Sequence, residues 1–323
     1  MIVFVVRRIA GLVAVLFGIS VLTFLIFFSV PGIDPTRAFA GRNPTPQTIA
    51  AVRHQFGLDR SKPVQYVLMM KRIFITRDLV SYGNTALKVV PAIWQAAPVT
   101  FSLVFGAAAI WIVFSIATGV LAVVFKGTVL DPLLMIFALI GISMPVFWLG
   151  EVANLITQDK LHHTFLFSWV PPLGYTPLTQ DPWQWFLHLI IPWLTLSVLY
   201  IGFYARVLRA NLLEVEHEDY VRTARAKGLS ERQILLRHML RTSLIPFVSL
   251  FGLDFGVLVG GGALLTEVVF GLPGVGLLTY QSLVNLDLPV IMATVIYGAF
   301  FITIASALVD ILYARLDPRI RFT

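Results

Sequence analysis

The chain has 323 residues, of which 58% are hydrophobic and only 13% are charged, and it contains no Cys. Soluble proteins carry about 25% charged residues, so this chain has too few charges to cover a water-soluble globule. The surplus apolar surface is expected to face lipid, and a disordered chain and a disulfide-stapled secreted scaffold are excluded. The net charge of +7 suits either nucleic acid or membrane-proximal loops, so its distribution must decide between them.

Six stretches are long and apolar enough to cross a membrane. A transmembrane helix needs about 20 mostly apolar residues because it crosses about 30 Å of hydrocarbon and must satisfy its own backbone hydrogen bonds. The six are Ile9–Val30, Pro98–Phe125, Pro132–Ile156, Trp185–Val207, Leu244–Val269 and Leu288–Leu312. The Gly- and Pro-rich segment from Glu267 to Asp287 indicates a loop or a short re-entrant segment, so the last two boundaries could be drawn differently. The sequence predicts an all-α integral membrane protein with six transmembrane helices.

The basic residues predict the orientation. Lys and Arg in short loops mark the cytoplasmic side. When residues 31–97 are set aside, one side holds Arg7 and Arg8, Lys126, the eight basic residues from Arg206 to Arg241 and three arginines near the C-terminus, whereas the other side holds only Lys160. Both termini are therefore expected in the cytoplasm. Membrane topology then explains the positive charge, and no nucleic-acid partner is expected.

This topology divides the chain into three parts. Residues 1–30 form the cytoplasmic N-terminal end and the first span, residues 31–97 an external loop or cap region, and residues 98–323 the core with the other five spans. The apolar spacing after Gln47 predicts short amphipathic helices in the external region. These helices suit a packed cap and a docking surface equally well.

The cytoplasmic loop of residues 209–243 has strong local signals. A first helix is predicted over Tyr220–Lys227, ending at Gly228, because glycine best tolerates the left-handed conformation that closes a helix. Ser230 followed by Gln233 matches a capping box that opens a second helix. Two short helices joined at a glycine form a compact knob that a groove on another protein could accept, although an ordinary solvated loop remains the alternative.

Several motifs, in order along the chain, resemble one known family. The stretch Tyr220–Leu229, YVRTARAKGL, is similar to the cytoplasmic signature of ABC-transporter permease subunits in the dipeptide and oligopeptide branch, of the permease B type. Residues 31–35, 57–66, 267–276 and 316–321 also resemble that branch. The general importer signature has Glu-Ala-Ala where this chain has Arg222, Thr223 and Ala224, so ATPase contacts cannot be transferred from sugar importers.

The resemblance implies a type I ABC importer permease fold in the bacterial cytoplasmic (inner) membrane. It implies four partners beside the lipid bilayer: a second homologous permease subunit in a heterodimer, two ATP-binding cassette ATPases and an external substrate-binding protein. The implied substrate is a dipeptide or oligopeptide, with nickel, glutathione or a sugar as alternatives. It assigns ATPase coupling to Glu218, Asp219, Tyr220, Arg222, Thr223, Ala224, Arg225, Ala226, Lys227, Gly228 and Leu229.

Two further groups of residues are candidates for the transport pathway. Ionisable residues inside a bilayer are costly and usually face the bundle interior or water. Asp254 therefore either lines the pathway or bonds to another helix, unless the span itself is misplaced. Glu151 either contacts substrate or is a satisfied carboxylate at the rim. The pathway candidates are Asp254, Glu151, Ser143 and Asn154. The external loop or gate candidates are Glu267, Phe270, Pro273, Gly274 and Asp287. Pro145, Pro192 and Pro246 would bend spans, as gates or as static kinks.

The sequence argues against catalysis in this chain. No Lys follows a Gly, so there is no Gly-Lys-Ser/Thr phosphate loop, and ATP with its Mg is expected on partner subunits. His162 and His163 are adjacent, so their side chains diverge and no metal site is predicted. A membrane-embedded enzyme using Glu151 and Asp254 as acid and base is the remote alternative, and it lacks a supporting His, Ser or metal cluster.

Overall fold

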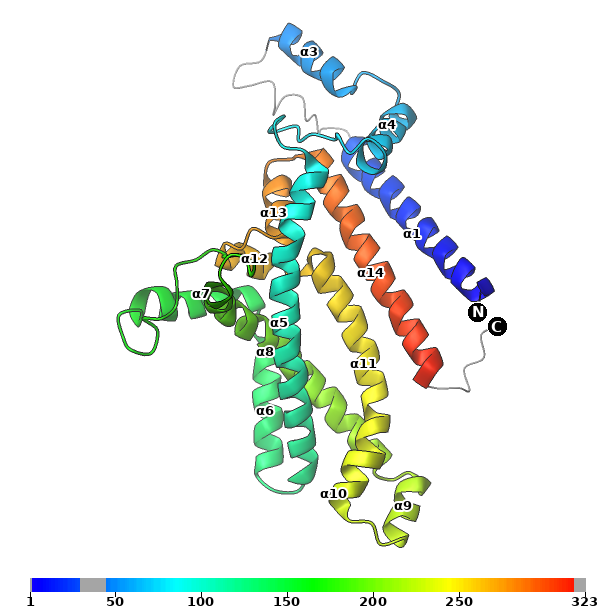
Figure 1. The fold of residues 1–323 in the computed structure, drawn as a ribbon, viewed down its shortest axis with the longest axis vertical. Helices are drawn as coiled ribbons and strands as arrows, with labels where there is room; N and C mark the ends of the chain where they lie inside the picture. Colours follow the sequence, from blue (N-terminus) through cyan, green and yellow to red (C-terminus); the bar gives the residue numbers. More distant parts are fainter. Residues whose placement is uncertain (1, 30–44, 317–323) are drawn as a thin grey trace. The chain divides into compact units, whose positions relative to one another are not determined.

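The computed structural model describes residues 2–29 and 45–316. Within these ranges the chain is helical and forms no strand, with one isolated β-bridge between Val80 and Lys88, which confirms the all-α prediction. The helices, drawn in Figure 1, are α1 (Ile2–Ser29), α3 (Pro46–Phe56), α4 (Lys62–Phe74), α5 (Val89–Val124), α6 (Leu130–Ser143), α7 (Val146–Asn154), η1 (Leu155–Lys160), α8 (Pro182–Val215), α9 (Asp219–Ala226), α10 (Glu231–Gln233), η2 (Ile234–Met239), α11 (Leu240–Val257), η3 (Leu258–Gly262), α12 (Leu264–Phe270), α13 (Val275–Val284) and α14 (Leu288–Leu316), where η marks π-helical geometry.

Five continuous helical stretches have the length and apolar composition of membrane spans. They are Ala10–Phe28, Val89–Val124, Pro182–Val215, Glu231–Gly262 and Leu288–Ile311. They correspond to the first, second, fourth, fifth and sixth predicted spans, and several extend well beyond the apolar core that the sequence indicated. Two bent helix pairs also have this length and apolar composition when each pair is taken together. The described residues therefore contain between five and seven possible membrane spans.

The third predicted span is wrong as a single helix. The structure divides Pro132–Ile156 into α6 and α7, and the two halves are bent by 93°. Met144 leaves the helical region at ψ 127°, and Pro145, at the N-cap of α7, is extended at ψ 132°. Since proline supplies no backbone N–H and disfavours a helical residue before it, the chain breaks here.

The fifth predicted span also ends earlier than Val269. Gly261, inside η3, has φ +108°, a conformation that side-chain-bearing residues rarely adopt, and it kinks the helix shortly before α12 begins. The following pair α12 and α13 is bent by 87°, with Gly271 in the left-handed region at φ +63°. The predicted loop or short re-entrant segment from Glu267 to Asp287 is therefore a hairpin of two short helices.

The chain forms two compact units, and α5, α11 and α14 each pass from one unit to the other. The first unit comprises residues up to 101 together with 256–304. Its core includes Phe24 and Phe28 of α1 and Met69 and Ile73 of α4, with Val275 of α13 and the buried start of α14.

Helix α4 packs on α1, so this part of the predicted external region is a packed cap. Tyr66 lies with its ring centroid 5.4 Å from that of Phe24, and its hydroxyl is 2.7 Å from Ser20 Oγ. The Lys62 ammonium donates to the carbonyl of Phe28. Val64 and Val67 on the same helix are exposed, which leaves an apolar face of α4 outside this packing.

The second unit comprises residues 102–255 and 305–323, of which the structure describes residues up to 316. Helices α6 and α8 pack closely in this unit: a Cβ on Gly202 would lie far inside contact distance of the Ala138 carbonyl, and one on Gly141 would lie 3.0 Å from the Val198 carbonyl. Small residues such as glycine let membrane helices approach this closely. Arg209 of α8 forms a bidentate ion pair with Asp131 of α6. Its Nε and Nη2 donate to the two carboxylate oxygens of Asp131, each at 2.7 Å.

A second close approach, in the first unit, joins η3 to α14. A Cβ on Gly260 would stand 2.9 Å from the Gly298 carbonyl oxygen, and a Cβ on Gly298 would stand 2.6 Å from the Gly260 carbonyl oxygen. The two backbones therefore touch, because neither residue carries a side chain that would keep them apart.

We expect Gly202→Ala to destabilise the protein by about 1–3 kcal/mol, the usual cost of inserting a methyl group where there is no room. Gly18→Ala is the matched control, because nothing lies within 4 Å of a Cβ built on Gly18 and alanine favours helix formation. Thermal unfolding of the purified protein in detergent measures both. Equal unfolding midpoints for the two variants would contradict the close packing of α6 on α8.

Candidate functional site

The predicted knob is present, and its first helix ends in a Schellman motif. Helix α9 ends with the Leu229 N–H bonded to the Ala224 carbonyl at 3.3 Å and the Gly228 N–H bonded to the Arg225 carbonyl at 2.9 Å. Gly228 has φ +77°, as this cap requires. The predicted helix of Tyr220–Lys227 is shifted by one residue, since the observed one runs Asp219–Ala226.

The second helix begins with the predicted capping box. The Ser230 side chain accepts a hydrogen bond from the Gln233 N–H at 3.4 Å, and the Gln233 side chain accepts one from the Ser230 N–H at 3.3 Å. Helix α10 then continues through η2 into α11, so the second arm of the knob is continuous with a membrane span. A displacement of the knob would reach that span through an unbroken helix.

A chain of ion pairs fastens the knob to neighbouring elements of its unit. Arg225 donates to both carboxylate oxygens of Glu231, at 2.9 and 3.2 Å, and lies 3.7 Å from Glu216. Glu216, just beyond α8, also accepts from Lys126 of the α5–α6 connection at 2.9 Å. The hydrogen bond to Glu231 raises the pKa of Arg225 further, so the guanidinium stays charged.

The coupling candidates divide into a buried and an exposed set. Ala224 is only 5% exposed and lies on the side of α9 that packs against η2, where its small size permits a close approach. It cannot therefore meet an ATPase directly. The exposed candidates are Glu218, Asp219, Tyr220, Arg222, Thr223, Arg225, Ala226, Lys227, Gly228 and Leu229. Sequence reasoning missed Glu216 and Lys126, which hold the knob in place.

Asp254 has the polar partner that a carboxylate in this position needs. Tyr204 of α8 donates to Asp254 Oδ2 of α11 at 2.6 Å. Tyr204 is fully buried and packs in an aromatic cluster with Trp111, Tyr200 and Phe247. Of the two interpretations that the sequence left open, the hydrogen bond to another helix is observed, and pathway lining stays a prediction.

The other three pathway candidates lie around the break in the third predicted span. Glu151 is exposed on α7, and Asn154 is partly buried at the end of that helix. Ser143 is exposed at the end of α6 and donates to the Leu139 carbonyl at 2.8 Å. The contact of these three residues with substrate stays a prediction.

Glu267 is fully buried, and its hydrogen bonds to Thr100 and Leu277 form a clamp that holds the α12–α13 hairpin. Its carboxylate accepts from Thr100 of α5 at 2.6 Å and from the Leu277 N–H at 2.9 Å. Thr100 Oγ1 in turn accepts from the Val275 N–H at 2.9 Å. A Cβ on Gly274 would collide with the Glu267 carboxylate, so only glycine fits there.

The remaining gate candidates flank this clamp. Phe270 is 3% exposed, whereas Pro273 is exposed at the tip of the hairpin. Asp287, just before α14, accepts from the Ser81 hydroxyl and from the Tyr82 N–H at 3.1 Å. It thereby ties the cap region to the start of α14. Their motion as a gate stays a prediction, and in the described ranges no group of three or more His, Cys, Asp or Glu could hold a metal.

Comparisons with known proteins identify the class of membrane protein. Residues 115–322 match the family described as binding-protein-dependent transport system inner membrane component, and residues 1–105 match its N-terminal counterpart. The chain belongs to this family, and it is therefore a permease subunit of an ABC importer, a multi-pass membrane protein whose curated relatives are named as permeases and not as enzymes.

Three relatives cover essentially the whole chain. A putative peptide transport system permease protein of Brucella abortus (strain 2308) is 36% identical over 98% of both chains. A glutathione transport system permease protein of Escherichia coli O6:H1 is 36% identical over 99% of both. A dipeptide transport system permease protein of Alkalihalophilus pseudofirmus is 31% identical over 100% of both.

We expect Glu267→Ala to destabilise the protein by about 2–4 kcal/mol, because it leaves the buried Thr100 hydroxyl and the partly buried Leu277 N–H without their acceptor. Glu267→Gln keeps one acceptor oxygen and should cost less. Glu151→Ala, which removes an exposed carboxylate, is the control for the loss of an acid. The yield of folded protein and its thermal unfolding midpoint measure the series. A wild-type midpoint for Glu267→Ala would show that the clamp does not hold the hairpin.

Asp254→Asn should assemble normally and alter transport if this residue lines the pathway. The partner variant Tyr204→Phe separates the two roles that the hydrogen bond leaves possible, since it removes the bond and keeps both ring and carboxylate. Uptake by membranes carrying the assembled importer measures both. Wild-type uptake of every substrate by Asp254→Asn, together with the same stability loss in both variants, would assign Asp254 a structural role only.

Proposed function

We propose that this chain forms half of the translocation pathway of an ATP-driven importer of dipeptides or oligopeptides, and that residues 218–229, the first helix of the knob with its cap, couple it to ATPase subunits. The observation that carries the proposal is the knob itself: a capped short helix, exposed on one side, fastened by ion pairs and continuous with a membrane span. A rigid element of this kind can transmit a displacement from an ATPase to the membrane span.

The names of the relatives favour a peptide substrate. Two of the three are named for peptide or dipeptide transport and one for glutathione, which is itself a small peptide. Glutathione is therefore the second candidate substrate, while nickel and sugar find no support in those names. The binding pocket of the associated external substrate-binding protein would discriminate between the two.

The proposal includes the partners that an importer of this kind needs. These are a second permease subunit in a heterodimer, two ATP-binding cassette ATPases that bind ATP and Mg, and a substrate-binding protein on the external side. The chain would lie in the bacterial cytoplasmic membrane with both termini and the knob in the cytoplasm. The positive charge of the segment from Arg206 to Arg241 supports this orientation.

The physical role of the knob is that of a rigid lever. Closure of the ATPases would move the knob as one body, and the continuous helix of α10, η2 and α11, which meets α9 at a set angle, would carry that movement to the membrane span. The Schellman motif and the capping box fix that angle. The exposed side chains, which include Asp219, Arg222 and Lys227, are the ones that an ATPase groove would contact.

We expect Gly228→Val to uncouple the importer. A β-branched side chain in the left-handed region costs about 1–2 kcal/mol, and relief of that strain would redirect Leu229 and α10. Nothing lies within 4 Å of a Cβ on Gly228, so the effect would come from backbone conformation and not from a clash. Substrate-stimulated ATP hydrolysis should be lost while membrane insertion persists, and ATPase co-purification reports whether docking survives.

The graded control is Gly228→Ala, whose smaller penalty should give an intermediate defect. Ala224→Asp attacks the same element independently, because it places a charge on the side of α9 that packs against η2. If an ATPase subunit co-purifies and hydrolyses ATP normally with both Gly228→Val and Ala224→Asp, and transport persists, the knob is not the coupling element and the proposed mechanism is wrong.

A further inference from the structure

A second site candidate lies in the first unit and shares no residue with the knob or with the pathway and gate candidates. It is a groove with a volume of about 280 Å³, to which α1, the end of α4, α5 and α14 each contribute side chains. All its lining residues belong to the first unit. Among the described residues that line it, Arg77 is the only charged one, and the others are aliphatic or aromatic. This composition fits a long apolar ligand that carries one negative group.

The groove has the depth of one membrane leaflet. Along α5 its lining residues extend from Val90, next to the start of the helix, to Phe101. At 1.5 Å per residue this distance is about 16 Å, and half of the hydrocarbon thickness is about 15 Å. Along α14 the lining residues extend from Ala293 to Phe301, again inward from the start of the helix. Both helices have the composition of membrane spans, so the groove faces the acyl chains of one leaflet.

Exposed aromatic side chains mark the end of the groove where α5 begins. Trp94 is 72% exposed and Phe74, in the last turn of α4, is 57% exposed, and both line the groove. Ile75, which follows Phe74, is also exposed. Tryptophan is enriched at the level of the lipid headgroups, where one side of its ring system is apolar and the other is wet. These residues indicate that this end of the groove lies at the membrane surface.

The same end of the groove is cationic. Residues 71–78 hold Lys71, Arg72 and Arg77 against a single acid, Asp78, which accepts a hydrogen bond from the Thr76 hydroxyl. Arg77 is exposed, and in the described part of the chain no carboxylate forms an ion pair with it. A guanidinium offers paired donors that match a phosphate group. Basic residues beside a membrane attract anionic lipid headgroups.

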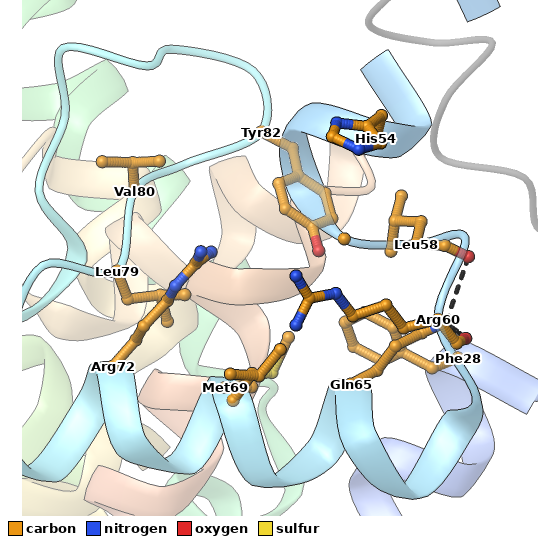
Figure 2. A pocket seen from close by; sticks show the side chains of 12 residues that line it. Phe28, His54, Leu58, Arg60, Gln65, Met69, Arg72, Leu79, Val80 and Tyr82 are labelled. Carbon is orange, nitrogen blue, oxygen red and sulfur yellow. Dashed lines mark hydrogen bonds between the residues drawn. The ribbon is translucent and has the colours of Figure 1, made fainter. Parts of the chain in front are cut away.

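Arg72 belongs to a different cavity. Figure 2 shows its side chain around a cavity of about 210 Å³ that Arg60 and Tyr82 also line, and Arg72 does not line the groove. Arg77 reaches the groove from beyond the end of α4, where the Ile75 and Thr76 N–H groups bond to the Lys71 carbonyl at 2.9 and 3.0 Å. The two arginines therefore carry the same charge in one short segment but line different cavities.

We propose that the groove binds an anionic phospholipid of the leaflet in which α5 begins, which is predicted to be the external one. One acyl chain would lie along α5 and α14, and Arg77 would hold the phosphate. A second protein subunit is the other candidate occupant, and it would have to bring a carboxylate to Arg77. The depth of one leaflet and the exposed Trp94 at the surface end favour the lipid. This inference does not depend on which substrate the importer carries.

The test titrates the full chain in detergent and measures the affinity of the first bound lipid by native mass spectrometry. The probes are dioleoyl phosphatidylglycerol, dioleoyl phosphatidylcholine, which has the same chains without net charge, and glycerol 3-phosphate, which lacks the chains. Phosphatidylglycerol should bind about fivefold tighter than phosphatidylcholine, and glycerol 3-phosphate should not bind detectably. Arg77→Gln should weaken phosphatidylglycerol by about fivefold and leave phosphatidylcholine unchanged.

Arg72→Gln is the matched control, because it removes the same charge from the same segment but from the other cavity. It should bind phosphatidylglycerol as the wild type does, and the thermal unfolding midpoint without lipid checks that both variants are folded. Equal weakening by the two variants would mean general surface electrostatics and would overturn the proposal. Equal binding of the two phospholipids would overturn it too, as would glycerol 3-phosphate that binds as tightly as phosphatidylglycerol.

The assembled importer separates the lipid from a protein occupant. Trp94→p-benzoylphenylalanine places a photo-reactive group at the surface end of the groove. Irradiation in native membranes should give a product heavier by the mass of one phospholipid. A cross-link to another polypeptide in place of the lipid would show that the groove is a subunit interface, and the proposal would be wrong. Normal substrate uptake in that case would leave the proposed function standing.

Discussion

Every backbone N–H and C=O that lies in hydrocarbon must find its partner inside the protein, and the breaks in the helices of this chain are arranged around that constraint. The first N–H groups of a helix have no partner within it. At the start of α13 the side chains of Thr100 and Glu267 take that role for Val275 and Leu277. A hairpin that would otherwise expose orphaned donors is thereby stabilised by two buried oxygen acceptors.

Sequence reasoning succeeded where the physical cause is local. Gly228 as a helix cap and Ser230 with Gln233 as a capping box depend on neighbours within a few residues, and both were predicted correctly. The apolar stretches also predicted where the long helices lie. Sequence reasoning did not predict the break after α6. A proline such as Pro145 within a long apolar run is equally compatible with a kink inside one continuous span.

The partners of Asp254, Glu267 and Asp287 could not have been predicted. Tyr204 and Asp254 are 50 positions apart, Thr100 and Glu267 are 167 apart, and Ser81 and Asp287 are 206 apart. A single sequence predicts that a membrane carboxylate needs a donor, but the identity of that donor follows only from how the helices pack.

The mutual contact of Gly260 and Gly298 restricts how this sequence can evolve. A methyl group on either residue meets the carbonyl oxygen of the other, so neither position can change while the two helices keep their spacing. A second substitution elsewhere cannot supply the missing room, because the obstacle is backbone and not a replaceable side chain. A substitution at either glycine would require one of the two helices to shift as a whole. Close homologues that keep this helix crossing should therefore have glycine at both positions.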